Sequence, residues 1–207
     1  MADTKTQIVD VPVSARPKKR STGIVGLNLI LDGGYPAGSV ILMYGSPLSG
    51  IDIAAKQFWK VEGEEGTYLM NDGDADVGMI DATELSPEMY LQQMAGGRIV
   101  VDSLTTIITK YGIESALKFL RHAREEMRKR DANMIVIVYT DVHQPIEMTR
   151  LMRAADIVIE LGSKPNQSEM ERTLTVHKVR DGAVPPRLLP FNILETGIEA
   201  STTSRVV

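Results

Sequence analysis

Residues 40–58 read VILMYGSPLSGIDIAAKQF, and this stretch decides the fold. An apolar run enters a turn of Gly, Pro and Ser and leaves as a helical pattern, which is the layout of a strand, a phosphate-binding loop and a helix. Gly45 and Gly50 keep the glycine spacing of the pattern G-x-x-x-x-G-K-S/T. Ile51 stands where that pattern has lysine, and Asp52 where it has a hydroxyl residue. The stretch is either a nucleotide site without its usual chemistry or a turn of similar layout.

The composition limits the class of protein. The chain has 207 residues, 43% of them hydrophobic, which suffices for one well-buried core and one principal domain. A net charge of −4 provides no overall basic field for nucleic acid or an anionic membrane. The absence of cysteine excludes disulfides and thiolate sites, and no segment approaches the roughly 20 apolar residues of a membrane span. We expect a soluble, cytoplasmic protein without a membrane partner.

Short apolar runs alternate with helical patterns along the chain. The runs are rich in β-branched residues, as strands buried on both faces of a parallel sheet are, and after residue 153 consecutive strands indicate an antiparallel meander. The predicted fold class is α/β, a mostly parallel twisted sheet flanked by helices, with antiparallel C-terminal strands. The expected strands are 40–45, 98–103, 134–140, 156–162, 172–182 and 187–197, and the expected helices are 51–62, 86–95 and 113–131.

Longer segments around the loop resemble the KaiC and RadA branch of the RecA-type ATPases. The segment STGIVGLNLILDGGYPAGSVILMYGSPLSG (21–50) is similar to the family's approach to its P-loop, and RIVVDSLTTI (98–107) to its Walker B strand. VHKVRDG (176–182) and LLPFNILETGIEA (188–200) are similar to its C-terminal strands. The resemblance implies a RecA-like fold, with the strands that end at the P-loop and at Walker B adjacent in one sheet.

The resemblance also divides the chain. We expect an N-terminal arm at 1–21, a RecA/KaiC-like domain at 22–200 and a tail at 201–207. The arm is polar, with two prolines and a basic end, as in segments that are disordered or docked on a neighbour. Between the strand after the P-loop helix and Walker B, residues 71–97 are shorter than the family's usual insert.

The P-loop match departs from the family at three positions. In a working loop the lysine neutralises the β and γ phosphates and the hydroxyl holds magnesium. Ile51 cannot do the first, and Leu48 replaces a glycine of the family pattern. The Asp52 carboxylate would repel a phosphate about 4 Å away by roughly 4 kcal/mol, about a thousandfold in affinity. The segment that would hold the nucleotide comprises Gly45, Ser46, Pro47, Leu48, Ser49, Gly50, Ile51 and Asp52.

Four further residues acquire roles from the resemblance. Asp102 matches the Walker B aspartate and would hold Mg²⁺ if a nucleotide binds. Asp72 lies in the stretch that matches the family's catalytic glutamate, but an aspartate is one methylene shorter, so it is only a weak candidate. Lys178 and Arg180 match the pair that in the KaiC branch reaches a neighbour's γ-phosphate.

Three functions of different classes fit these residues. The favoured one is a non-hydrolysing pseudo-ATPase that regulates or scaffolds through association with itself or with related RecA/KaiC-like subunits, with no cofactor. In this hypothesis the arm residues IVDVPVSA (8–15) add a strand to a neighbour. The alternatives are a KaiC-like ATPase that binds ATP and Mg²⁺ through an unusual loop, and a DNA-binding recombinase paralogue; nucleic acid is the less favoured partner. Titration with nucleotide and with single-stranded DNA separates the three.

Overall fold

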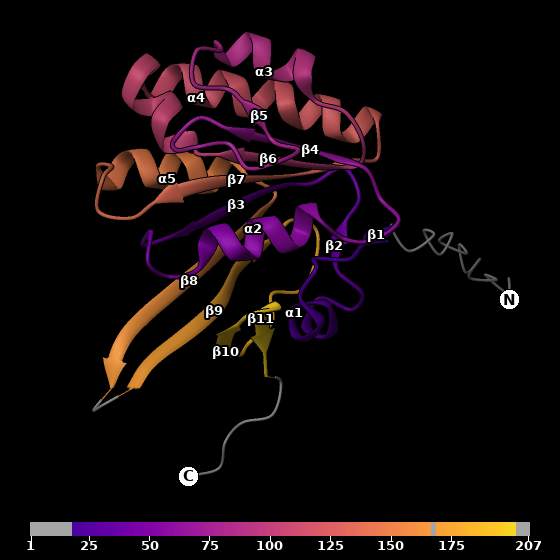
Figure 1. Cartoon of the computed structure of the whole chain (residues 1–207), viewed down its shortest axis with the longest axis vertical. Coiled ribbons are helices and arrows are strands. Elements are labelled where there is room, and N and C mark those ends of the chain that lie inside the picture. Colours follow the sequence, from indigo (N-terminus) through magenta and orange to yellow (C-terminus); the bar gives the residue numbers. More distant parts are fainter. Residues whose placement is uncertain (1–17, 167–168, 202–207) are drawn as a thin grey trace, which may run out of the picture.

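The computed structural model describes residues 18–166 and 169–201, which build a mixed sheet with helices on both faces (Figure 1). In sheet order the nine strands are β11 (Gly197–Ala200), β10 (Leu189–Leu194), β9 (Glu169–Val179), β8 (Ile157–Asn166), β3 (Val40–Gly45), β7 (Asn133–Tyr139), β6 (Arg98–Asp102), β4 (Gly66–Met70) and β5 (Ile80–Asp81). The pairings from β5 to β8 are parallel, and those among β8, β9, β10 and β11 are antiparallel. The predicted α/β class with an antiparallel C-terminal meander is confirmed.

One predicted adjacency is wrong. The strands β3 and β6 share a sheet, but β7 lies between them, because Gly45 pairs with Tyr139 of β7 and Val101 of β6 pairs with Val136. The residues Met134 to Val138 of β7 are buried, so this strand suits the centre of the sheet. As a result, the end of β7 stands between the end of β3 and Asp102.

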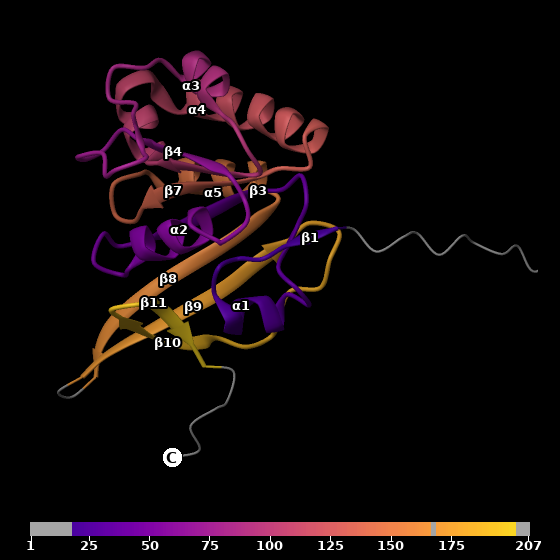
Figure 2. The ribbon, with the colours of Figure 1, turned by 45° about the vertical axis from the view of Figure 1, so that its right-hand side comes forward.

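Two apolar cores lie on the two faces of the sheet. Figure 2 shows the helices that cover these faces. The strand β3 contributes to both, because successive side chains of a strand point to opposite faces: Ile41 and Met43 join one core, and Val40 and Leu42 the other. The first core is closed by α1 (Val25–Ile30) and α2 (Ile51–Trp59), and the second by α3 (Pro87–Gln93), α4 (Leu104–Lys129) and α5 (Pro145–Ala154).

The helices differ from the predicted ones in number and extent. The helix α4 begins at Leu104, nine residues before the predicted start, and Gly112, with φ of 80°, interrupts its helical backbone. The helices α1 and α5 were missed. No helix in the described part of the chain is long and apolar enough to cross a bilayer.

A second sheet, of two strands, joins the end of the predicted arm to the domain. The strands β1 (Lys19–Arg20) and β2 (Tyr35–Pro36) pair antiparallel. The Arg20 side chain also contacts Glu64 and the carbonyl of Asp131. The predicted strand addition by residues 8–15 and the tail after residue 201 lie outside the described residues.

Candidate functional site at the C-terminal ends of the parallel strands

The loop between β3 and α2 needs its two glycines for backbone reasons. A Cβ on Gly45 would lie 2.5 Å from the carbonyl oxygen of Leu161 on the neighbouring strand β8. Gly50 has a φ of 87°, a left-handed conformation that side chains disfavour, and a Cβ there would lie 2.7 Å from Ile193. The glycine spacing is therefore explained by the packing of the loop, whatever the loop binds.

The middle of the loop is closed by its own hydrogen bonds. The backbone N–H of Ser49 donates to the carbonyl of Ser46 at 2.9 Å, and the Ser49 hydroxyl donates to the same oxygen at 2.6 Å. The backbone N–H of Leu48 donates to the Ser46 hydroxyl at 3.2 Å. Pro47 has no N–H to donate. Three consecutive positions of the loop thus offer no free backbone donor.

The residues that depart from the P-loop pattern face different surroundings. Ile51, at the lysine position, begins α2 and is completely buried in the core beneath that helix. Leu48, at the glycine position, is 82% exposed at the loop tip. Asp52 is half-buried in the first turn of α2, where the helix dipole favours a carboxylate. Among the described residues, no cation forms an ion pair with it.

Asp102 ends β6 in a pocket of tyrosine hydroxyls. Tyr68 donates to its Oδ2 at 2.6 Å, and Tyr139, at the end of the intervening strand, donates to its Oδ1 at 3.2 Å. Burial raises the pKa of Asp102, and the nearby charges of Asp72 and Asp52 act in the same direction, while the two hydroxyls oppose the shift. Asp102 therefore lies near enough to Asp52 and Asp72 to interact with their charges.

The loop after β4 is held by neutral partners. Asp72 accepts a hydrogen bond from the Ser103 hydroxyl at 2.8 Å, and Asn71 accepts one from the backbone N–H of Ser103. The amide of Asn71 donates to the Tyr90 hydroxyl at 2.7 Å. Asp72 thus lies beside Walker B, but its hydrogen bond with Ser103 fixes the loop. Its catalytic role stays a prediction.

The nearest lysine is already engaged. Lys56 on α2 forms an ion pair with Asp76 at 2.8 Å, and this contact, with the charges of Asp52 and Asp102, raises the pKa of Lys56. The described residues contain no group of three or more His, Cys, Asp or Glu side chains arranged to hold a metal ion. The assignment of Asp102 as a magnesium ligand stays a prediction.

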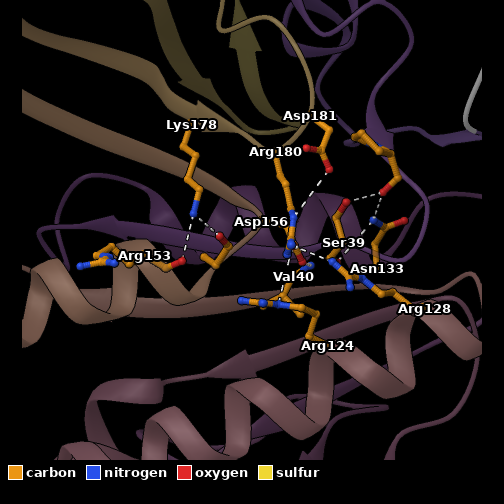
Figure 3. A network of polar contacts seen from close by, with 12 residues as sticks. Ser39, Val40, Arg124, Arg128, Asn133, Arg153, Asp156, Lys178, Arg180 and Asp181 are labelled. Atoms are coloured by element: carbon orange, nitrogen blue, oxygen red, sulfur yellow. Dashed lines mark hydrogen bonds and ion pairs between the residues drawn. The ribbon is translucent and has the colours of Figure 1, made fainter.

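Lys178 and Arg180 lie at the opposite end of the strands (Figure 3). The Lys178 ammonium donates to the carbonyls of Met152, Arg153 and Ala155 at the end of α5. The Arg180 guanidinium binds Asp156, which directly precedes β8, at 2.9 Å. Both residues therefore lie at the end of the sheet opposite the loop of the same chain. Their contact with a neighbouring chain stays a prediction.

Both the sequence and the fold are similar to those of known proteins. A model of the KaiC ATPase family matches residues 80–204, more than half of the chain. The chain belongs to the KaiC ATPase family. No curated protein matches the chain. Among solved structures, a KaiC-like protein from the hyperthermophilic archaeon Pyrococcus horikoshii OT3 matches with a TM-score of 0.71 and 18% sequence identity, over 89% of this chain and 99% of that one. At this identity the match shows a shared fold.

Sequence reasoning missed the residues that surround Asp102 and Asp156 in this KaiC-family chain. Tyr68 and Tyr139 read as strand residues, since each ends or interrupts an apolar run and nothing local shows that they converge on Asp102. Pro47 was visible as a residue without an N–H, a signal that bears directly on phosphate binding. Asp156, a carboxylate placed just before the apolar strand β8, could have been suspected of capping that strand.

Proposed function

We propose that this KaiC-family domain is a pseudo-ATPase, which does not bind ATP at its loop and acts through association with other protein chains. The observation that carries the proposal is the closed loop: the N–H groups of Leu48 and Ser49 are bound within the loop, and Pro47 has none. A phosphate cradle requires such N–H groups to point at the anion. These contacts support the proposal that ATP with Mg²⁺, the cofactor that the family implies, is not held by the loop.

Electrostatics supports the same proposal. The side chain at the lysine position, Ile51, is buried in the core, so it provides no positive charge at the loop. Asp52 and Asp102 are negative groups on the same edge, and Lys56 is paired with Asp76. A triphosphate placed there would meet like charges and no free cation, at a cost of several kcal/mol at short range.

The family model matches the part of the chain after residue 79. The KaiC model matches residues 80–204, which include Walker B and the C-terminal strands and leave out the loop at 45–52. A domain that keeps the fold and loses the loop chemistry retains the surfaces through which subunits can assemble. Regulation or scaffolding beside related subunits is the function that this combination supports best.

Calorimetric titration of Mg-ATP and Mg-ADP into the full chain tests the proposal. We expect no saturable binding below about 1 mM, which corresponds to less than about 4 kcal/mol of binding free energy. Micromolar binding by the unchanged protein would show that the proposal is wrong and would favour the alternative, an ATP-binding KaiC-like enzyme with an unusual loop.

Restoring variants show whether the loop causes the effect. Leu48→Gly, Ile51→Lys and Asp52→Thr together return the family residues, and the combined variant should bind Mg-ATP at least about tenfold more tightly than the parent. Asp74→Lys is the matched control, because it makes the same change of two charge units at an exposed position of a neighbouring loop without touching residues 45–52. Equal gains from the control and the restored loop would assign the effect to net charge alone.

A further inference from the structure

A buried histidine lies in the connection between β7 and α5 (Figure 1). We call residues 140–144 the His143 loop. The side chain of His143 is only 3% exposed, although the neighbouring Val142 is 59% exposed. An imidazole ring in such a position loses most of the water that would stabilise its charged form. The loop therefore carries a titratable group that packs inward between exposed neighbours.

The imidazole is the side chain that fastens this loop to α4. Its Nε2 lies 3.0 Å from the hydroxyl oxygen of Thr105, in the first turn of α4. Among the described residues, the side chains of Asp141 and Val142 form no hydrogen bond or ion pair.

The two ends of the loop are held independently of the ring. The backbone N–H of Thr140 donates to the carbonyl of Gly45 at 3.0 Å, and that of Gln144 donates to the Glu147 carboxylate at 3.0 Å. Release of the ring would thus free a short segment between two fixed points.

The hydrogen bond to Thr105 suits a neutral ring. The Thr105 hydroxyl already accepts the backbone N–H of Tyr139 at 3.0 Å, and its own proton can be donated to a ring nitrogen that carries none. These partners assign the ring proton to Nδ1, which lies 3.9 Å from the Glu147 carboxylate. Protonation of Nε2 would turn the acceptor into a donor and would leave the hydroxyl proton without its partner.

The charges around the ring do not offset its burial. Glu147 on α5 favours the charged ring, but it lies beyond hydrogen-bond distance of Nδ1, and α4 faces the ring with an uncharged hydroxyl. Burial therefore dominates over Glu147 and lowers the pKa of His143. The other charged side chains of the loop and of the adjoining helix turns are exposed or engaged elsewhere: Asp141 is exposed, Lys110 donates to the carbonyl of Thr83, and Arg150 pairs with Glu114.

We propose that His143 is a pH-sensitive latch: the neutral imidazole holds the His143 loop against α4, and protonation releases it. The released loop uncovers the Thr105 hydroxyl beside the exposed side chains of Val142 and Ile146. The latch is also connected to Asp102, because Tyr139 donates to Thr105 through its N–H and to Asp102 through its hydroxyl. The inference goes beyond the proposed function and does not depend on whether the P-loop position binds ATP.

The direction of the pH effect follows from linkage. The ring of the released loop has the ordinary histidine pKa of about 6.5, and the ring of the held loop has a lower pKa. The held loop is therefore fully favoured above about pH 6.5 and loses its advantage as the pH falls through the lower pKa. One proton is involved, so the ratio of released to held loop rises by at most about tenfold per pH unit.

Nuclear magnetic resonance on the full chain gives the readout. We expect the ring protons of His143 to titrate with a midpoint below about pH 6.5, and the backbone amides of residues 141–143 to shift with the same midpoint. Amide exchange of these residues, corrected for its intrinsic pH dependence, should become severalfold faster between about pH 7.5 and pH 5.5. A midpoint at or above about 6.5, or amides that do not follow the ring, would overturn the proposal.

His143→Gln separates a pH-sensitive latch from a contact that is merely structural. The glutamine side chain can accept the Thr105 hydroxyl proton and does not titrate, so the corrected exchange of residues 141–143 should no longer depend on pH. His143→Asn is the second variant if His143→Gln fails to fold. His122→Gln is the matched control, since His122 on α4 has no hydrogen bond among the described residues, and it should keep the parent's response. An equal acid response in His143→Gln and the parent would overturn the proposal.

Glu147→Gln tests the charge that opposes burial. Glutamine can still accept the Gln144 N–H, but it removes the negative charge beside Nδ1, so the midpoint of the ring should fall below that of the parent. An unchanged or higher midpoint would overturn the geometry on which the latch rests. ATP binding in calorimetry would contradict the proposed function alone, because every measurement of the latch is made without nucleotide.

Discussion

At the residue scale, Ile51 is a core residue. The position that holds a lysine in the P-loop pattern here contributes a fully buried side chain to the core under α2. Ile51→Ala should lower the free energy of unfolding by about 2–5 kcal/mol, because it removes buried methyl groups and leaves a cavity. Urea denaturation measures this, with Leu48→Ala at the exposed loop tip as the control that should change little. Equal effects of the two would contradict the buried role of Ile51.

Asp102 makes stability depend on pH in a defined direction. Its folded pKa is raised, chiefly by burial, so the folded state holds its proton more tightly than the unfolded state does. The contribution of Asp102 to stability is therefore greatest below its unfolded pKa of about 4 and is lost as the pH rises through the folded pKa. Asp102→Asn removes this loss. The variant should gain stability relative to the parent as the pH rises above about 4.

Denaturation of both proteins at a series of pH values checks this expectation. Asp74→Asn, an exposed carboxylate in the nearby loop, is the control and should follow the parent at every pH. A constant difference between Asp102→Asn and the parent across this range would show that the pKa of Asp102 is not raised in the folded protein.

At the element scale, Asp156 ties the start of β3 to α4 and β9. Asp156→Ala would leave the Val40 N–H without its carboxylate and would leave three arginines without their shared anion. Removal of one partner from a buried ionic network is costly, so we expect a loss of about 3–5 kcal/mol in urea denaturation. Asp181→Ala removes only an exposed, distant partner of Arg180 and should be close to neutral. A neutral Asp156→Ala would contradict the structural role of this carboxylate.

The elements that the sequence predicted best are those with a continuous apolar pattern. The apolar runs of β3, β6 and β7 and the C-terminal meander gave the fold class, because burial on both faces requires such runs. Strand order was not predictable in the same way: the position of β7 between β3 and β6 depends on long-range packing that no local pattern records. The start of α4 was missed because Thr105, Thr106 and Ile107 are β-branched and read locally as strand.

The candidate site was predicted in part for a related reason. Spacing located the loop, and the family resemblance located Asp102, at the ends of parallel strands of one sheet. The closure of the loop by Ser46 and the convergence of Tyr68 and Tyr139 on Asp102 depend on side-chain and backbone directions in the folded state. Those contacts, rather than the motif, decide what the edge can bind.

At the scale of the whole molecule, the two ends of the sheet should behave independently in stability. Ile51 lies under α2 near the loop, and Asp156 lies at the other end of β3, beyond direct contact. The double variant Ile51→Ala with Asp156→Ala should therefore lose the sum of the single losses to within about 0.5 kcal/mol. A double-mutant cycle in urea measures the difference, and a coupling above about 1 kcal/mol would show that the sheet transmits strain between its ends.

The two loop glycines bear on how members of an ATPase family that do not bind nucleotide can be recognised from sequence. Gly45 and Gly50 are demanded by the backbone of Leu161, by Ile193 and by a left-handed φ, and none of these involves a ligand. A lineage that abandons nucleotide chemistry is therefore still constrained to keep this pair, because a substitution would disturb the junction of strand and helix. The glycine spacing in such a chain therefore reports the backbone geometry of the loop. The residues at positions 51 and 52 report whether the loop has the side chains for nucleotide binding.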